Sequence, residues 1–567
     1  MHSLIRKFNI GLWGFLGLAV CLSCFGLLIE SLPKGHDLVF HLSRIESLAK
    51  GLQWGGFLVR IYPDYFNGYG YANGMMYPDL FLYPAALLCL AGIRVTLAYK
   101  IMILVYTFLT AIFMYRTLIK ITGHEWASRL GMLLYTVSLY RMVDVWTRAA
   151  LGEIIAFMFI PFIILGIYYI FFDDERKWYD LTIGFSGIFL SHLLSGLMWT
   201  VALAGICIFK SVKLIKNRSR LWSLVKATMM SLLLVSYYLF PMFEQLISQN
   251  FRVSNDANYE LNWLFSIREV FFTYWISGNP DNWFPGGVGI SVIGLVLFGL
   301  LVKDKESIQR QQTIAWTSLM ISIVVLVMMC NFFPWHSVVK YAVFLGRLQF
   351  PWRLLMIATA FLTLTFSLFF SLARPYQKLF GIAIVIHSVM LGVNAECETL
   401  RYHTKILEEP LARTEIMHDS VTDRRYMVGN GEYIPIETDV ELMLERENQY
   451  TLNQDINYVT KQEGTTITID FSGQIQSPLE FEVPLLYYKG YGAKLITDSG
   501  ETSLQVMSGT NGAVRVILSE VVGEGKIVIS YEGTTLQKIT EVISFMSLIG
   551  FTIIVSRYYL NDKKSSI

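Results

Sequence analysis

The chain is poor in charge for its length. Of its 567 residues, Asp, Glu, Lys and Arg make up 16%, whereas 54% are hydrophobic and the mean hydropathy is +0.47. Such a composition excludes an ordinary soluble globular protein. The formal net charge of +2 gives no indication of a nucleic-acid partner. Long apolar runs recur between residues 9 and 396, and another follows at 539–559, so we predict a polytopic α-helical membrane protein.

Cysteine and several familiar catalytic motifs are also scarce. Five of the six cysteines lie in apolar runs and Cys397 borders one, so the soluble segment after it has none with which to build a disulfide framework. Cys21 and Cys24 stand three apart within an apolar run, where packing explains them better than chemistry. No GxGxxG motif opens a helix, and the chain has no Walker A lysine motif, no HExxH and no cysteine pairs with zinc spacing.

The distribution of Lys and Arg sets the predicted topology. Residues 79–97 decide it, because a full crossing there would move every later loop to the other side. This segment is short and interrupted by Pro84, and basic clusters fall repeatedly inside only if it is juxtamembrane or re-entrant. About twelve crossings with both termini inside are then predicted. They lie near residues 9–31, 98–120, 125–143, 150–172, 180–191, 193–210, 222–245, 287–303, 312–332, 353–373, 379–396 and 539–559.

This layout divides the chain into three parts. Residues 1–396 form a transmembrane domain with a large first outer loop at 32–97, and residues 539–567 form a last helix with a cytoplasmic tail. Residues 397–538 are acidic and show strand-like alternation at 465–471, 479–483, 514–518 and 526–531, with turn signals such as Asn511-Gly512 between them. We therefore expect an extracellular linker followed by an antiparallel β-sandwich at about 430–535.

The first outer loop holds the most informative polar residues. Asp37 stands between His36 and His41, and a helix over 38–50 would place Asp37, His41 and Arg44 near one face. A carboxylate there can take a proton from a hydroxyl group, and an arginine can bind a phosphate through two hydrogen bonds. Two simpler interpretations remain open: the loop carries interfacial charge by chance, or Asp37 caps the helix that follows.

Other predicted outer segments contribute further candidates for a wet cleft. Aromatic residues such as Tyr69 suit the apolar faces of sugars, but they suit an ordinary interfacial aromatic belt equally well. The remaining candidate substrate-binding residues are Arg60, Asp144, Arg148, Glu153, His192, Arg347 and Arg353.

Several motifs in combination resemble bacterial membrane proteins of the C-type glycosyltransferase (GT-C) superfamily. The branch that they match is found in Firmicutes, and its members carry the label "6-pyruvoyl-tetrahydropterin synthase-related" membrane protein. The resemblance covers nearly the whole chain. Besides the His36–Arg44 segment, the matching segments are 60–63, 68–71, 77–78, 148–153, 190–195, 348–353 and 483–491.

The resemblance implies a transferase that uses a polyprenyl-phosphate-linked sugar at the outer face of the bacterial cell membrane. The general base of that superfamily corresponds to Asp37. Asp37-Leu38-Val39 lacks the paired carboxylates of metal-dependent oligosaccharyltransferases, so an inverting reaction without a metal or other cofactor is expected. Asp79 replaces a proline common in the family, and the histidine cluster that a pterin synthase needs is absent.

The predicted function is transfer of a sugar to a cell-wall or teichoic-acid-type acceptor. Arg148, Arg347 or Arg353 would hold the lipid phosphate. The alternative is a non-enzymatic transporter or scaffold for envelope lipids or polysaccharide. A transporter predicts charges near mid-bilayer and two related halves, whereas the charges here concentrate at the predicted outer ends of the spans.

Overall fold

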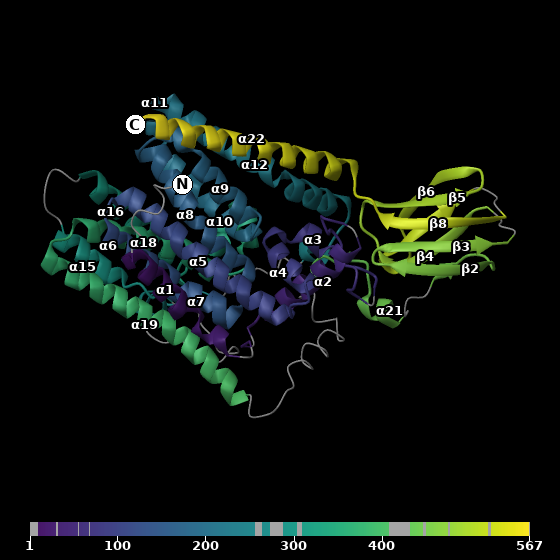
Figure 1. Ribbon diagram of the computed structural model, residues 1–567, viewed down its shortest axis with the longest axis horizontal. Helices are drawn as coiled ribbons and strands as arrows, with labels where there is room; N and C mark the ends of the chain where they lie inside the picture. The colour runs from purple at the N-terminus through teal and green to yellow at the C-terminus, as the bar shows by residue number, and fades with distance from the viewer. Residues whose placement is uncertain are drawn as a thin grey trace. The chain divides into compact units, whose positions relative to one another are not determined.

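The computed structural model describes residues 10–29, 32–33, 35–54, 56–66, 68–255, 264–272, 287–302, 309–406, 431–445, 450–473, 477–519 and 523–565. The chain divides into two compact units, and each is described by itself. Unit 1 comprises Met1–Leu38, Tyr99–Ser231 and Asn258–Arg413. Unit 2 comprises Val39–Ala98, Leu232–Ala257 and Thr414–Ile567. Figure 1 labels their helices and strands.

Eight helical segments in the described residues are long and apolar enough to cross a membrane. A crossing needs roughly 20 apolar residues, and each of these segments meets that requirement or comes close to it. They coincide with eight predicted spans and confirm the membrane character of the chain. The segments are Gly11–Leu28, Val95–Thr122, Leu151–Phe172, Arg218–Ser248, Arg310–Val327, Pro351–Leu372, Pro375–Arg401 and Thr535–Tyr558.

The other four predicted spans form shorter helices. Residues 125–143 contain α6 (Glu125–Thr136) followed by α7 (Leu139–Val143). The remaining three predicted spans correspond to α9 (Tyr179–Phe189), α10 (Leu193–Phe209) and α15 (Val292–Val302). The longest of the four, α10, has 17 residues, which at about 1.5 Å per residue fall short of a hydrocarbon core of roughly 30 Å. The count of about twelve crossings therefore stays a prediction.

Residues 79–97 form a short, broken apolar element in the structure. A 3₁₀ turn, η2 (Leu80–Leu82), leads into α4 (Tyr83–Leu90), and Gly92 then takes a φ of 89° before α5 (Val95–Thr122) begins. A positive φ suits glycine and ends the helix. The apolar helix Leu80–Leu90 is too short to cross a bilayer alone, in agreement with its omission from the predicted spans.

Unit 1 is a bundle of helices around two nearly buried ones, α8 (Leu151–Phe172) and α18 (Leu355–Leu372). Both are apolar on all sides, which is typical of helices in a bundle interior. Helix α18 packs along α16 (Gln309–Val327), and α8 packs along α9. The α8–α9 approach is close at Gly166, where an added Cβ would lie 2.5 Å from the backbone nitrogen of Leu181.

Unit 2 contains helix α22 (Thr535–Ser565) and an antiparallel sheet of eight strands. The strands are β1 (Thr451–Leu452), β2 (Asn457–Glu463), β3 (Thr466–Ser472), β4 (Leu479–Leu486), β5 (Tyr491–Thr497), β6 (Gly500–Ser508), β7 (Ala513–Leu518) and β8 (Glu524–Tyr531). Their order in the sheet is β1-β4-β7-β6-β5-β8-β3-β2, and Figure 1 shows them together. The four strand patterns read from the sequence correspond to β3, β4, β7 and β8.

The sheet curls over its own apolar face. The rings of Phe471 on β3 and Phe481 on β4 lie 6.2 Å apart, although four strands separate β4 from β3 in the sheet order. Ile469, Val483 and Val516 are also fully buried, so apolar side chains from both halves share one core. The predicted β domain is therefore present, but as one continuous curled antiparallel sheet rather than as the two separate sheets of a sandwich. Of the predicted linker, residues 407–430 lie outside the described residues.

Candidate active site

Asp37 is positioned by backbone hydrogen bonds to a tight turn of unit 1. The amide of Asp37 donates to the carbonyl oxygen of Arg148 at 2.8 Å, and the amide of His36 donates to that of Thr147 at 3.3 Å. The acceptors lie in a π-helical turn, Asp144–Arg148, which ends at Ala149 with a left-handed φ of 52°. A left-handed conformation is costly for alanine and indicates a backbone held by its surroundings.

Close packing accompanies these hydrogen bonds. A Cβ added to Gly35 would lie 2.5 Å from the Cβ of Ala149 and 3.1 Å from its backbone nitrogen. Only glycine fits so near another backbone. The segment 35–37 is thus held against residues 147–149 by both hydrogen bonds and shape.

The carboxylate of Asp37 is half-buried, whereas His36 is exposed. Burial raises the pKa of Asp37 above its ordinary value, and the positive charges of Arg148, Arg353 and His36 oppose that rise. Asp37 therefore keeps part of its surface exposed and is a stronger base than a free aspartate. These are the properties expected of a general base.

Beside Asp37, unit 1 contains a buried charge cluster made of Asp144, Arg148, Glu153 and Arg353. Arg148 pairs with Asp144 through Nη1 and with Glu153 through Nη2, the latter at 2.9 Å. Arg353 Nε lies 3.3 Å from the same Glu153 oxygen. All four side chains are at least nine-tenths buried. Two cations thus balance two carboxylates in a place where an unpaired charge would be costly.

Two aromatic residues, Tyr140 and Trp352, complete the cluster. The hydroxyl of Tyr140 donates to Glu153 Oε2 at 2.5 Å. The guanidinium of Arg148 lies over the ring of Trp352, 4.3 Å from its centroid, a cation–π contact. Trp352 was within reach of the sequence analysis, since it lies in the 348–353 motif. The indication for Tyr140 was weaker, namely only that it lies one helical turn before Asp144.

Three polar atoms of the cluster are buried and make no hydrogen bond within the described residues: Asp144 Oδ2, Arg353 Nε and Arg353 Nη1. Of these, Arg353 Nε faces Glu153 at 3.3 Å, whereas Nη1 has no such neighbour among the same residues. Buried polar atoms are rarely left so, and a ligand is one recognised reason. A free guanidinium nitrogen is a strong donor to a phosphate or carboxylate oxygen. Arg353 is therefore the arginine of this cluster best suited to hold an incoming anion.

His192 and Arg347, the other two candidates in unit 1, differ in setting. His192 is buried at the N-cap of α10, where Nδ1 accepts a hydrogen bond from the amide of Ser195 at 3.3 Å. It is also close enough to Glu153 for their charges to interact. Arg347 lies in an exposed 3₁₀ turn, η7 (Val343–Leu348).

The other four candidates belong to unit 2, where His41 and Arg44 form a buried group of their own on α2 (Leu38–Gln53). Arg44 Nη1 lies 3.3 Å from His41 Nδ1, and Nη2 donates to the Pro78 carbonyl at 2.7 Å. The Tyr77 ring covers the guanidinium at 4.2 Å. Nearby, burial raises the pKa of Asp79 to about 6, against the opposing charges of Arg44 and Arg60.

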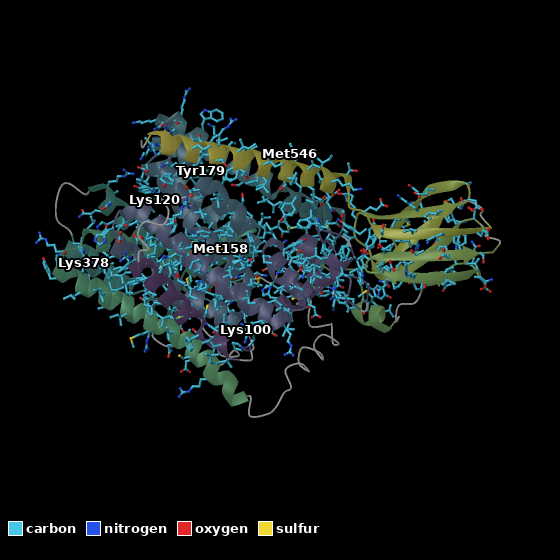
Figure 2. The ribbon with its side chains drawn as sticks, viewed as in Figure 1. Lys100, Lys120, Met158, Tyr179, Lys378 and Met546 are labelled. Carbon is cyan, nitrogen blue, oxygen red and sulfur yellow. The ribbon has the colours of Figure 1, made fainter. Side chains whose placement is uncertain are left out.

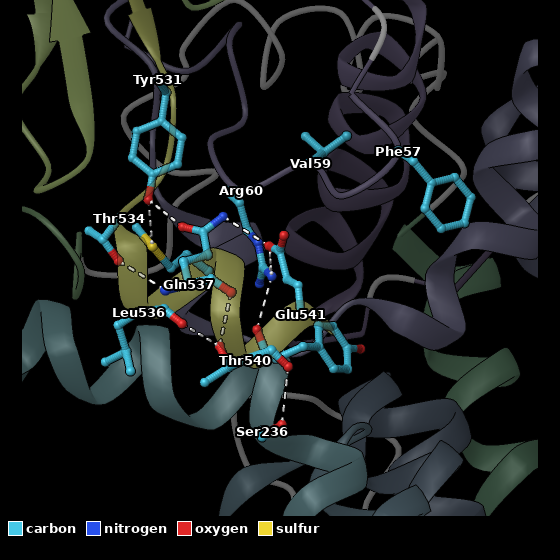
Figure 3. Close-up of polar contacts among 12 residues, drawn as sticks. Phe57, Val59, Arg60, Ser236, Tyr531, Thr534, Leu536, Gln537, Thr540 and Glu541 are labelled. Carbon is cyan, nitrogen blue, oxygen red and sulfur yellow. Dashed lines mark hydrogen bonds and ion pairs between the residues drawn. The ribbon is translucent and has the colours of Figure 1, made fainter. Parts of the chain in front are cut away.

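Arg60 and Tyr69 contact other parts of unit 2. Arg60 pairs with Glu541 of α22 at 2.7 Å (Figure 3). It also donates to the Tyr237 carbonyl at 2.9 Å. The amide of Leu486 on β4 donates to the carbonyl oxygen of Tyr69 at 2.8 Å, and the Tyr69 side chain is buried. Both therefore connect the first loop to α22 or the sheet, a role that the sequence motifs did not indicate.

Among the residues that the structure describes, no three His, Cys, Asp or Glu side chains are grouped as a metal site would require. Whether the reaction needs a metal stays a prediction. Comparison of the chain with protein-family models, with curated proteins and with solved structures gave no match.

Proposed function

We propose that this protein is a GT-C-like membrane glycosyltransferase that moves a sugar from a polyprenyl-phosphate-linked donor to a cell-envelope acceptor at the outer face of a bacterial membrane. The single observation that supports it most is the placement of Asp37. A half-buried carboxylate of raised pKa lies beside the buried charge cluster, in which Arg353 Nη1 is free to bind. The combination joins a base with an anion-binding group.

In the proposed reaction, Asp37 takes the proton of an acceptor hydroxyl as its oxygen bonds to the anomeric carbon. The bond from that carbon to the phosphate oxygen breaks, and the polyprenyl phosphate leaves as an anion with inversion of configuration. Arg353 binds the phosphate, and Arg148 is held by Asp144 and Glu153. The acceptor is a wall polysaccharide or teichoic-acid-type polymer, and no metal or other cofactor takes part.

Substitution of Asp37 by asparagine tests the proposal in purified protein reconstituted with a polyprenyl-phosphate sugar and acceptor polymer. Because Asn cannot take the proton, turnover should fall by roughly a hundredfold or more, with donor affinity little changed. If Asp37 only caps α2, which begins at Leu38, Asp37→Asn should be silent, since Asn caps helices equally well. Full sugar transfer by a folded Asp37→Asn protein would contradict the catalytic role.

A matched control is Asp64→Asn in the same first loop. Asp64 accepts hydrogen bonds from Ser47 at 2.7 Å and Lys50 at 2.9 Å, all within unit 2. Its loss should leave turnover near that of the unaltered protein. Wild-type protein that binds and moves the lipid without transferring sugar would instead support the transporter alternative.

A further inference from the structure

A cavity of about 490 Å³ opens in unit 1 among the ends of three helices, away from Asp37 and the buried charge cluster. Residues 122–124 line it after the end of α5, Arg310 and Gln311 at the start of α16, and residues 371–372 at the end of α18. The lining mixes polar and apolar surface, includes His124, Arg310 and Gln311, and contains no carboxylate. The kind of ligand that the cavity can bind therefore depends on which hydrogen-bond donors face it.

His124 has one hydrogen-bond donor too many around its ring. As the N-cap of α6, its Nδ1 accepts from the amide of Ala127 at 3.2 Å. A neutral imidazole has one acceptor nitrogen and one N–H, so the proton must be on Nε2. Yet Nε2 lies 3.2 Å from Nζ of Lys378, and an ammonium group can only donate. Two donors thus face each other without an acceptor between them.

The surroundings keep this arrangement in place. The ring of Phe370 meets the His124 ring edge-to-face at 6.3 Å and lies 5.6 Å from Lys378 Nζ. Burial, and then the charge of Lys378, lowers the pKa of His124, so the ring stays neutral and offers one N–H. The nearby carboxylates are engaged elsewhere, Glu125 with Arg129 and Asp173 with Arg310 at 3.6 Å.

We propose that a phosphate group, either of a lipid headgroup or of a soluble phosphate, binds at this cavity. It accepts hydrogen bonds from Nε2 of His124, a lining residue, and from Nζ of Lys378, which lies 3.2 Å from that nitrogen. An oxyanion with several acceptor oxygens can accept from both donors at once, and a charge-assisted bond to Lys378 strengthens the contact. Arg310 and Gln311 line the same space. Arg310 Nη2 already donates to the Tyr168 hydroxyl and the Phe172 carbonyl. Gln311 Nε2 donates to the Thr122 carbonyl at 3.5 Å, so only the remaining N–H groups of the two side chains can serve as further donors. The volume exceeds that of a bare phosphate and leaves room for an ester group.

Thermal unfolding of the full-length protein in phosphatidylcholine nanodiscs tests this site. Inorganic phosphate should raise the midpoint above that in chloride of matched ionic strength, and the concentration dependence gives an apparent affinity. Lys378→Gln should weaken that affinity by about tenfold or more, since a charge-assisted bond is lost. His124→Asn should act similarly, because Asn still caps α6 but has no ring N–H.

Lys120→Gln is the matched control, since it removes a lysine at the end of α5 rather than the lysine whose Nζ lies 3.2 Å from His124 Nε2 (Lys120 and Lys378 are labelled in Figure 2). It should bind phosphate like the unaltered protein. In chloride, Lys378→Gln should unfold no earlier than the unaltered protein, because it relieves two opposed donors.

A second set of nanodiscs with phosphatidylglycerol distinguishes the two sources. If phosphatidylglycerol stabilises the unaltered protein, and added phosphate then has no further effect, the ligand is a headgroup. The Lys378 and His124 variants should not be stabilised by this lipid. If added phosphate alone stabilises, the ligand is soluble. Two results would contradict the site. In one, neither phosphatidylglycerol nor added phosphate stabilises the protein. In the other, they stabilise the Lys378 and His124 variants as much as the unaltered protein.

Discussion

The amide of Asp37 donates to the carbonyl oxygen of Arg148 at 2.8 Å, while the side chain of Arg148 pairs with Asp144 and Glu153. One residue therefore connects the buried charge cluster to the backbone of the proposed base. Any movement of the cluster would be transmitted to Asp37 through a short, rigid turn. The position of Asp37 therefore depends on the charged cluster and also on the uncharged contact between Gly35 and Ala149.

Gly35→Ala should displace Asp37 because its new Cβ would lie 2.5 Å from the Cβ of Ala149. A displacement of about 1 Å can cost a hundredfold in rate, so kcat should fall at least tenfold with little change in the KM of the donor. Ala149→Gly removes the opposing methyl group and tolerates the φ of 52°, so the double variant should recover much of the lost kcat.

Amide hydrogen exchange of residues 35–38 provides a readout independent of activity. Exchange at Asp37 should accelerate in Gly35→Ala and slow again in the double variant, as the bond to Arg148 re-forms. Unchanged exchange and unchanged kcat in Gly35→Ala would show that the close contact does not position Asp37.

The acid limb of the pH–rate profile should reflect the raised pKa of Asp37. Burial raises that pKa, so activity should fall on acidification at a pH above the ordinary aspartate range near 4. The carboxylate must be ionised to accept a proton, so activity should fall, and not rise, as the pH is lowered. A kcat/KM profile flat through this range would contradict the assignment.

The same raised pKa has a consequence for stability. A folded-state pKa above the unfolded value means that the folded chain binds the proton more tightly. The favourable contribution is complete below the unfolded pKa and is lost as pH rises through the folded pKa. Asp37→Asn should therefore unfold at neutral pH no earlier than the unaltered protein, which chemical or thermal denaturation measures.

Hydropathy predicted the long helices well because a span of about 20 apolar residues leaves an unmistakable local pattern. Four predicted spans form shorter helices. The turn at Ser191-His192 between two of them was expected, whereas the break of 125–143 into α6 and α7 leaves no mark in a hydropathy average. Strands β1, β2 and β6 were missed because their side chains are mostly exposed, which weakens the alternation on which strand prediction depends. Strand β5 does alternate between buried and less buried residues, but Gly492 and Ala493 give it a weak sequence signal.

The sequence identified candidate residues by their chemical type, but it did not predict which side chains contact one another. Asp144, Arg148, Glu153 and Arg353 come together in unit 1, as a cluster of motif residues was expected to. Arg60 instead pairs with Glu541, 481 positions away, and nothing local in the sequence indicates that partner. Long-range pairings of this kind depend on the fold, which motif spacing does not contain.

Arg353 and Arg347 were equal candidates for binding the donor phosphate, and the structure separates them. Arg353 is buried beside Glu153 with Nη1 free, whereas Arg347 is exposed. Arg353→Ala should raise the donor Kd by roughly tenfold to a hundredfold, the range for a lost hydrogen bond to a charged group, and kcat should change less. Arg353→Lys keeps the charge but not the fork of donors and should recover part of the affinity.

Arg347→Ala should leave donor binding close to normal in the same titration of labelled polyprenyl-phosphate sugar. A larger loss from Arg347→Ala than from Arg353→Ala would move the phosphate to the exposed turn and away from the cluster.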